Sequence, residues 1–304
     1  MLRKLYISDG KLSETGNGEP AVLVYIAPDE NERRYLLEQL KIDEHTLNSA
    51  FDPDELSRLE FEPEHVAMIF KRPKRYTAQD NFLFKVLSTG VFLFKDRLVI
   101  VVADDAPLFE GRPFLKVQSI QDVCLKLIYG AILHFVEHLK AINQISSELE
   151  YHISTSMENK YLLNLFTLEK SLVYFLSAIN SNSMLIEKLR NNATKLGFSQ
   201  ETSEFLDDIM IENSQCRGQT EIYTQVLASL MDARASIISN NLNIRIKALT
   251  LITIAIMLPT LVVSIFSMNV GIPLSAHQHG FWIILTIAAI SAISVGLLWW
   301  RRWW

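Results

Sequence analysis

The chain has 304 residues, of which 49% are hydrophobic, and its formal net charge is −5 at pH 7. This composition can bury a core, which excludes broad disorder, and a mildly acidic chain without a basic stripe excludes nucleic acid as the expected partner. Cys124 and Cys216 are far apart in a chain that starts without an apolar leader, so we expect no disulfide framework and a reduced cytosolic setting for the N-terminal part.

Residues 1–115 have the pattern of an α/β domain. Short apolar runs alternate with a segment of helical periodicity, and turn residues separate them. The predicted elements are strands at 21–27 and 65–70, a helix at 31–40 after the capping residue Asp29, and a hairpin over 90–104 that turns at Lys95 and Asp96.

Residues 116–247 change to long helical patterns that are poor in Gly and Pro. Helices at 118–157 and 160–192 are long enough to pair as an antiparallel hairpin. A third helix begins after Gly197, and because residues 219–258 contain neither Gly nor Pro, we expect this stalk helix to continue into the membrane. A stalk this long can bury an apolar stripe only against neighbours, which predicts a symmetric oligomer. The stripe consists of Ile222, Val226, Leu230, Ala233 and Ile237.

The last part of the chain, 248–304, is expected to be a membrane domain. Residues 248–300 contain no Lys, Arg, Asp or Glu. The run 248–266 reaches roughly 28 Å as a helix, which spans a bilayer core, and 281–300 is a second such run with all five tryptophans in or beside it. Basic residues flank the outer ends of both spans but not the loop between them, which predicts that both termini are cytoplasmic. These residues are Arg245, Lys247, Arg301 and Arg302.

Polar residues share one side of the first span. Steps of three and four residues collect Asn243, Ile246, Thr250, Thr253, Met257, Thr260, Ser264 and Ser267 on this side, which we call the polar stripe. One interpretation is helix packing through small polar residues, whose hydroxyls can bond to their own helix. The other is a pore wall for a solvated ion, because Mg²⁺ keeps its water and can be recognised through it. Pro259 also frees the carbonyl of Ala255 within the membrane.

The first span ends in Phe266-Ser267-Met268-Asn269, with Pro273 soon after and the second span close behind. This segment, preceded by the long stalk helix, resembles the CorA family of magnesium transporters, whose signature is Gly-Met-Asn. The resemblance covers the whole chain and is strongest from about Asp208 onward. It implies an α/β cytoplasmic domain, a helical hairpin with a stalk helix, two transmembrane helices, and a funnel-shaped homopentamer in the cell (inner or plasma) membrane.

The resemblance also implies roles for individual residues. Copies of Asn269, beside Met268, would receive a hydrated cation at the external mouth. Ser267 replaces the signature glycine, and because glycine tolerates backbone angles that strain a serine, the replacement is expected to affect the geometry of the loop. Asp208, with Asp207 beside it, matches a regulatory divalent-ion site on the stalk, and Asp80 of a neighbouring subunit is the candidate partner acid. The pore-facing positions would be Asn243, Ile246, Leu249, Met257, Thr260 and Ser264, nearly the polar stripe, with Ile246, Leu249 and Met257 as the gate.

The leading hypothesis is a channel that passes Mg²⁺, and also Co²⁺ or Ni²⁺, into the cytoplasm, with no enzyme activity. A second hypothesis is a Zn²⁺-preferring, proton-coupled transporter, suggested by Ser267 and by His277 and His279, since imidazole suits Zn²⁺, Ni²⁺ and Co²⁺. A third is a membrane-anchored sensor or scaffold that conducts nothing. His134 and His138, in an H-x-x-E-H pattern that some zinc peptidases share, have no evident third ligand, so we expect an ordinary helix surface there.

Overall fold

The structure is a computed structural model that describes residues 1–304 apart from 17, 156–158, 272–276 and 303–304. The chain divides into two compact units, Met1–Met231 and Asp232–Trp304, which we describe one at a time. The boundary between the units falls inside the long helix α5 (Gln200–Phe266), so this helix contributes to both.

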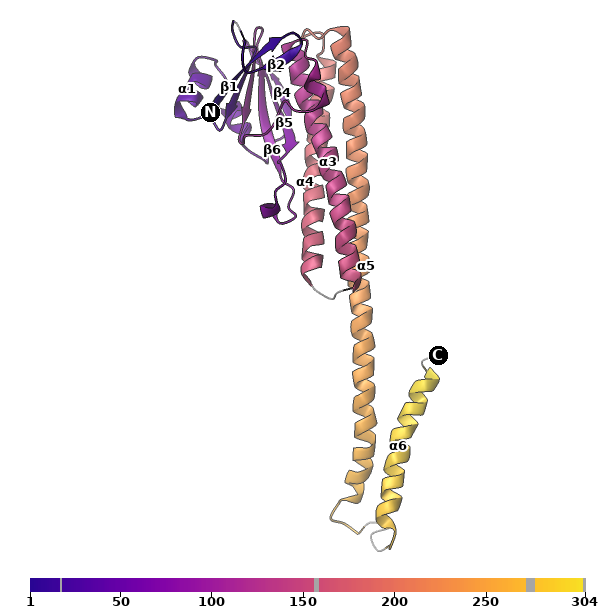
Figure 1. The fold of residues 1–304 in the computed structure, drawn as a ribbon. Coiled ribbons are helices and arrows are strands. Elements are labelled where there is room, and N and C mark those ends of the chain that lie inside the picture. Colours follow the sequence, from indigo (N-terminus) through magenta and orange to yellow (C-terminus); the bar gives the residue numbers. More distant parts are fainter. Residues whose placement is uncertain (17, 156–158, 272–276, 303–304) are drawn as a thin grey trace. The chain divides into compact units, whose positions relative to one another are not determined.

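The first unit is built on a seven-stranded sheet (Figure 1). The strands are β1 (Leu2–Ser8), β2 (Lys11–Ser13), β3 (Val22–Ile26), β4 (Arg58–Phe61), β5 (Val66–Pro73), β6 (Val86–Leu93) and β7 (Leu98–Val102). Their order in the sheet is β2-β1-β3-β7-β6-β5-β4. Only β3 and β7 pair in parallel, and both strands are apolar and buried along their whole length, as strands covered on two faces are. The two predicted strands and the predicted hairpin are thereby confirmed.

The alternation of side chains along each strand divides the core into two layers. In β3, Val22 and Val24 belong to one hydrophobic cluster, while Leu23 and Tyr25 belong to the other. The helices α1 (Glu30–Glu38) and α2 (Glu44–Ser49) cover the second cluster. The first cluster is covered by α3 (Ile120–Thr155), α4 (Asn159–Asn191) and the beginning of α5. Figure 1 shows these two groups of helices on opposite faces of the sheet.

A capping box begins α1. The Asp29 carboxylate accepts a hydrogen bond from the backbone N–H of Glu32 at 2.8 Å, and the Glu32 carboxylate accepts one from the N–H of Asp29 at 3.1 Å. Each side chain therefore satisfies a backbone donor that the first helical turn leaves free. The helix predicted after Asp29 is confirmed.

The helices α3 and α4 form the predicted antiparallel hairpin against the sheet (Figure 1). By length and composition alone, three helices among the described residues are long and apolar enough to cross a membrane, whereas the sequence predicts two. The third candidate lies within α4, which packs against α3 and β5 and buries Leu168, Leu172 and Phe175 completely. Packing against protein therefore accounts for the apolar character of α4.

Polar side chains of α4 close an open edge of the sheet. The ladder between β4 and β5 ends at the pair Arg58–Ile69, so the outer edge of β5 is free at Lys71. The amide of Asn182 takes the place of a neighbouring strand there: its oxygen accepts from the N–H of Lys71 and its nitrogen donates to the carbonyl of Lys71, both at 2.8 Å. Ser57 donates to the same amide oxygen at 2.8 Å. This buried network fastens α4 to β5.

The second unit contains the end of α5 and helix α6 (Gly280–Arg302). Large apolar side chains along both helices are exposed, for example Leu249, Ile256, Ile290 and Leu297. An apolar surface of this extent is unfavourable in water and favourable in lipid. The two predicted spans coincide with two of the three helices that satisfy the membrane criterion.

Candidate functional site

The predicted pore-lining residues all lie on the part of α5 that belongs to the second unit. Every one of them is exposed in the single subunit, as are most of the Leu, Ile and Val residues around them. Exposure therefore does not single out the stripe; the three- and four-residue spacing that places its hydroxyl groups on one side of the helix does. The residues are Asn243, Ile246, Leu249, Thr250, Thr253, Met257, Thr260 and Ser264.

The hydroxyl groups of the stripe donate their protons to the helix itself. Thr250, Thr253 and Thr260 each donate to the carbonyl four residues earlier, at 2.8, 2.9 and 2.7 Å. Thr286 in α6 does the same at 2.7 Å, so this bonding is a general property of threonine in these helices. Once its proton is used, each hydroxyl oxygen offers only acceptor lone pairs to its surroundings. A file of such oxygens can accept hydrogen bonds from the water molecules around a cation.

Pro259 lies inside α5, which continues past it to Phe266. Because proline has no N–H, the carbonyl of Ala255 receives no backbone hydrogen bond from position 259. The hydroxyl of Thr260, the next residue, donates to the carbonyl of Ile256 and not to that of Ala255. The carbonyl of Ala255 is thus a further acceptor at this level of the helix.

The signature segment follows directly after α5. The N–H and the hydroxyl of Ser267 both donate to the carbonyl of Ser264, at 3.2 and 2.9 Å, so Ser267 closes the helix end. Ser267 is not among the described residues with positive φ, so the backbone strain expected from replacing glycine is not found in this chain. Met268 and Asn269 are exposed beyond the helix end. Pro273, also part of the resemblance, lies outside the described residues.

The three acids predicted to bind regulatory cations differ in their surroundings. Asp207 forms an ion pair with Arg190 of α4, with 2.7 Å between Oδ1 and Nε. Asp208 is exposed and has no ion pair among the described residues. Asp80 accepts hydrogen bonds from the N–H and the hydroxyl of Thr77, which hold the pKa of its carboxyl below the usual value. Within the described part of one chain, no hydrogen bond or ion pair joins Asp80 to either stalk acid.

The H-x-x-E-H segment lies in the middle of α3. The His138 ring is buried between Phe84 and Phe175, with ring centroids 5.2 and 6.1 Å away. Burial, followed by repulsion from His134, lowers the pKa of His138 to about 4. Among the described residues no group of three or more His, Cys, Asp or Glu side chains could hold a metal ion. The expectation of an ordinary helix surface is therefore wrong here: His138 belongs to the core, and His134 lines a cavity.

The two histidines before α6 are both exposed. Their carbonyls accept the N–H groups of Gly280, Trp282 and Ile283, so the backbone of this segment begins the helix. Their imidazole rings could surround a common axis only in an assembly of several copies of the chain. The single chain thus leaves the expected role of His277 and His279 in metal preference a prediction.

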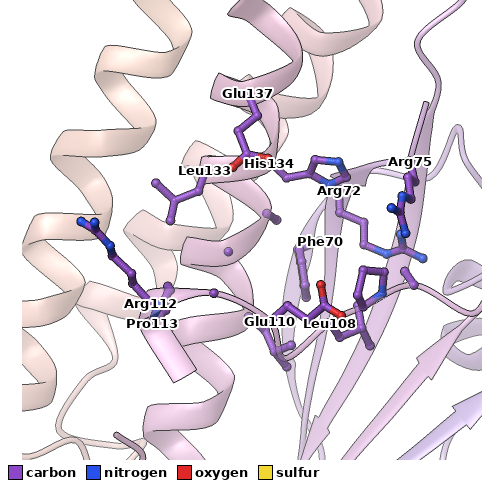
Figure 2. A pocket seen from close by; sticks show the side chains of 16 residues that line it. Phe70, Arg72, Arg75, Leu108, Glu110, Arg112, Pro113, Leu133, His134 and Glu137 are labelled. Carbon is purple, nitrogen blue, oxygen red and sulfur yellow. The ribbon is translucent and has the colours of Figure 1, made fainter. Parts of the chain in front are cut away.

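A cavity of about 610 Å³ in the first unit was not anticipated from the sequence (Figure 2). It lies between β5, the segment that follows β7, and α3. Arginines from two of these elements and His134 of α3 line it together with apolar side chains. No periodicity or motif brings these residues together, because they come from three separate parts of the chain.

Comparison with known proteins agrees with this geometry. The family model described as CorA-like Mg²⁺ transporter protein matches residues 23–302. The cobalt/magnesium transport protein CorA of Methanocaldococcus jannaschii is 22% identical over 278 residues, which cover 86% of this chain and 84% of that protein.

Solved structures share the fold over the full length. The complete structure of the CorA magnesium transporter from Methanocaldococcus jannaschii has a TM-score of 0.83 at 19% identity and covers 100% of this chain and 98% of its own. The full-length CmaX protein has a TM-score of 0.74 at 15% identity, with 99% and 98% covered. The α/β domain, the long helices and the pair of membrane helices are therefore the architecture that the resemblance predicted. The chain belongs to the family of CorA-like Mg²⁺ transporter proteins and is a CorA-type divalent-cation transporter.

Proposed function

We propose that this protein is a homopentameric channel that passes Mg²⁺ into the cytoplasm through a pore lined by the polar stripe of α5. Co²⁺ and Ni²⁺ are further candidate ions. The N-terminal unit and both chain ends lie on the cytoplasmic side of the cell membrane, in agreement with the basic residues that flank the two spans.

The observation that carries this proposal is that hydroxyl groups whose protons are bonded to the helix recur at steps of three and seven residues along one side of α5. A hydrated Mg²⁺ turns the hydrogens of its water shell outward, and it gives up that shell reluctantly. Thr250, Thr253 and Thr260 offer oxygens whose own protons are already bonded to the helix. Five copies around one axis would surround the ion with acceptors at successive levels and recognise it through its water.

No pump is required for inward transport. A divalent ion that moves down a membrane potential of 100 mV gains about 4.6 kcal/mol, twice the value for one elementary charge. Ile246, Leu249 and Met257 place apolar levels along the same stripe, where loss of water would close the pore. Cytoplasmic cation bound at Asp208 would hold the subunits together and keep these levels closed.

The test is Mg²⁺ uptake into proteoliposomes that contain the reconstituted protein. Asn269→Ala should abolish uptake while the oligomer persists, because the external ring of amide oxygens is lost. Gln278→Ala is the matched control, since Gln278 is an exposed amide in the same loop. Unchanged Mg²⁺ uptake by Asn269→Ala would remove the proposed selectivity ring.

The exposed histidines of the loop favour one second candidate, a Zn²⁺-preferring and proton-coupled transporter. The same vesicles separate the two, with Zn²⁺ in place of Mg²⁺ and with or without a pH gradient. Zn²⁺ uptake that exceeds Mg²⁺ uptake and depends on the pH gradient would replace the magnesium proposal. Absence of uptake for every divalent ion would instead indicate a membrane-anchored sensor.

A further inference from the structure

The cavity in the first unit has the size and the mixed lining of a small-molecule site. Its volume of about 610 Å³ falls in the usual range for such sites, roughly 300–1,000 Å³. Apolar side chains, including Phe70, Leu108 and Leu133, make up much of the lining, and six of the sixteen lining residues carry charged or titratable side chains. A ligand that fits this lining has an apolar part and several polar groups.

Three nitrogen-bearing side chains meet at one side of the cavity. Figure 2 shows His134 of α3 directed toward Arg72 and Arg75 at the end of β5. Arg72 is buried and held in place by the carboxylate of Asp104 and by Thr89, to whose hydroxyl its Nε donates at 3.0 Å. Arg75, in contrast, is exposed and has no hydrogen bond or ion pair among the described residues. Its guanidinium is available to a ligand.

The charges around the cavity point to a ligand with both acceptors and donors. Burial is the main cause that lowers the pKa of His134; Glu137 opposes this shift, and the nearby Arg72 and Arg75 add to it. The imidazole has at least one N–H to donate in either protonation state. Glu110 and Glu137 also line the cavity, and Arg112 lies at the opposite side from Arg75 (Figure 2). Arginine suits a phosphate, while the two carboxylates suit hydroxyl or amino donors.

A glycine in the wall keeps the cavity open. Gly130 lies in the interior of α3, where glycine is unfavourable relative to alanine, and its φ is not positive. A Cβ at this position would meet only Phe114, at 3.9 Å, so close packing does not require glycine either. A side chain at position 130 would occupy the cavity itself.

From these observations we infer that the cavity binds a nucleoside phosphate. Arg75 and Arg72 with His134 receive the phosphate, the apolar lining receives the base, and Glu110 and Glu137 accept hydrogen bonds from hydroxyl or amino groups. The site lies entirely within Met1–Met231 and does not rest on the proposed transport function. It has no glycine-rich phosphate loop, so the inference concerns binding and not hydrolysis.

The test is isothermal titration of the full-length protein in detergent with AMP, in EDTA so that no divalent ion takes part. AMP should bind at one saturable site per chain, and more tightly than either inorganic phosphate or adenosine. Arg75→Ala should weaken AMP binding roughly tenfold or more, as loss of a charge-assisted bond does. Arg34→Ala, which removes an exposed arginine remote from the cavity lining, should leave the affinity unchanged.

A second variant tests the space and not the charge. Gly130→Leu places a side chain in the cavity and should abolish AMP binding while thermal unfolding shows a folded protein. If Gly130→Leu does not fold, Arg75→Ala alone decides the matter. Absence of saturable AMP binding to the wild type, or binding that Arg75→Ala leaves unaltered, would overturn the assignment. Equal affinity for phosphate and AMP would overturn its nucleoside part.

Discussion

Removing the Asn182 amide should destabilise the first unit strongly. Asn182→Ala leaves the N–H and the carbonyl of Lys71 without partners, in a region where Asn182 itself is completely buried. Each buried polar group that loses its partner costs about 1–3 kcal/mol, so the two backbone groups together cost roughly 2–6 kcal/mol. Ser57, which is also buried, donates to the same amide and loses its acceptor as well, so this range counts the two backbone groups alone.

Thermal unfolding of the full-length protein in detergent measures this change. For a unit of this size about 1 kcal/mol shifts Tm by roughly 2–4 °C, so the expected fall for Asn182→Ala is roughly 4–24 °C. Hydrogen exchange at the Lys71 amide should accelerate as well, because that N–H is no longer bonded. The two measurements together distinguish loss of the edge contact from general loosening.

The control is Asn192→Ala, since Asn192 is only partly buried and its side chain makes one bond, to the carbonyl of Lys188 at 2.8 Å. Its Tm should change by about 2 °C or less. If Asn182→Ala unfolds within 2 °C of the wild type and the Lys71 amide stays protected, the amide does not act as the missing strand neighbour. The edge of β5 would then be held by other contacts.

The remaining predictions concern transport, pH and helix stability. Asp208→Ala should leave uptake active at cytoplasmic Mg²⁺ concentrations that inhibit the wild type; unaltered inhibition would show that Asp208 is not the sensor. Thr253→Val removes an acceptor from the proposed pore wall and should lower Mg²⁺ uptake about fivefold, the value of roughly one hydrogen bond, whereas Thr286→Val in α6 should not. Equal effects of the two variants would contradict the proposed role of the stripe. The folded pKa of His138 is about 4 against 6.5 when unfolded, so its contribution to stability is complete above pH 6.5 and is lost as pH falls toward 4, by up to roughly 3 kcal/mol. His138→Phe should flatten the dependence of Tm on pH in this range, and an unchanged slope would refute the assignment. Gly130→Ala should raise the free energy of unfolding by roughly 0.5–1 kcal/mol, because the glycine has neither positive φ nor a close neighbour; a lower Tm would show that the added methyl group is not tolerated there.

Local patterns determined much of this architecture. The capping residue Asp29, the turn between β6 and β7, the two long helices of the hairpin and the uncharged runs in the membrane domain are all visible in the sequence. They depend on interactions between residues a few positions apart, or on the cost of placing charge in lipid. The same patterns led to the resemblance that the family model confirms.

Only the tertiary structure decided which residues meet across the first unit. Asn182 and Lys71 are 111 positions apart, and neither belongs to a recognisable motif. The cavity likewise brings Arg75, which follows the end of β5, together with His134 and Gly130 of α3. Periodicity marks α4 as apolar but does not say whether protein or lipid covers it; packing against α3 and β5 does. Contacts between distant segments follow from how the elements pack, and one-dimensional spacing carries no record of that.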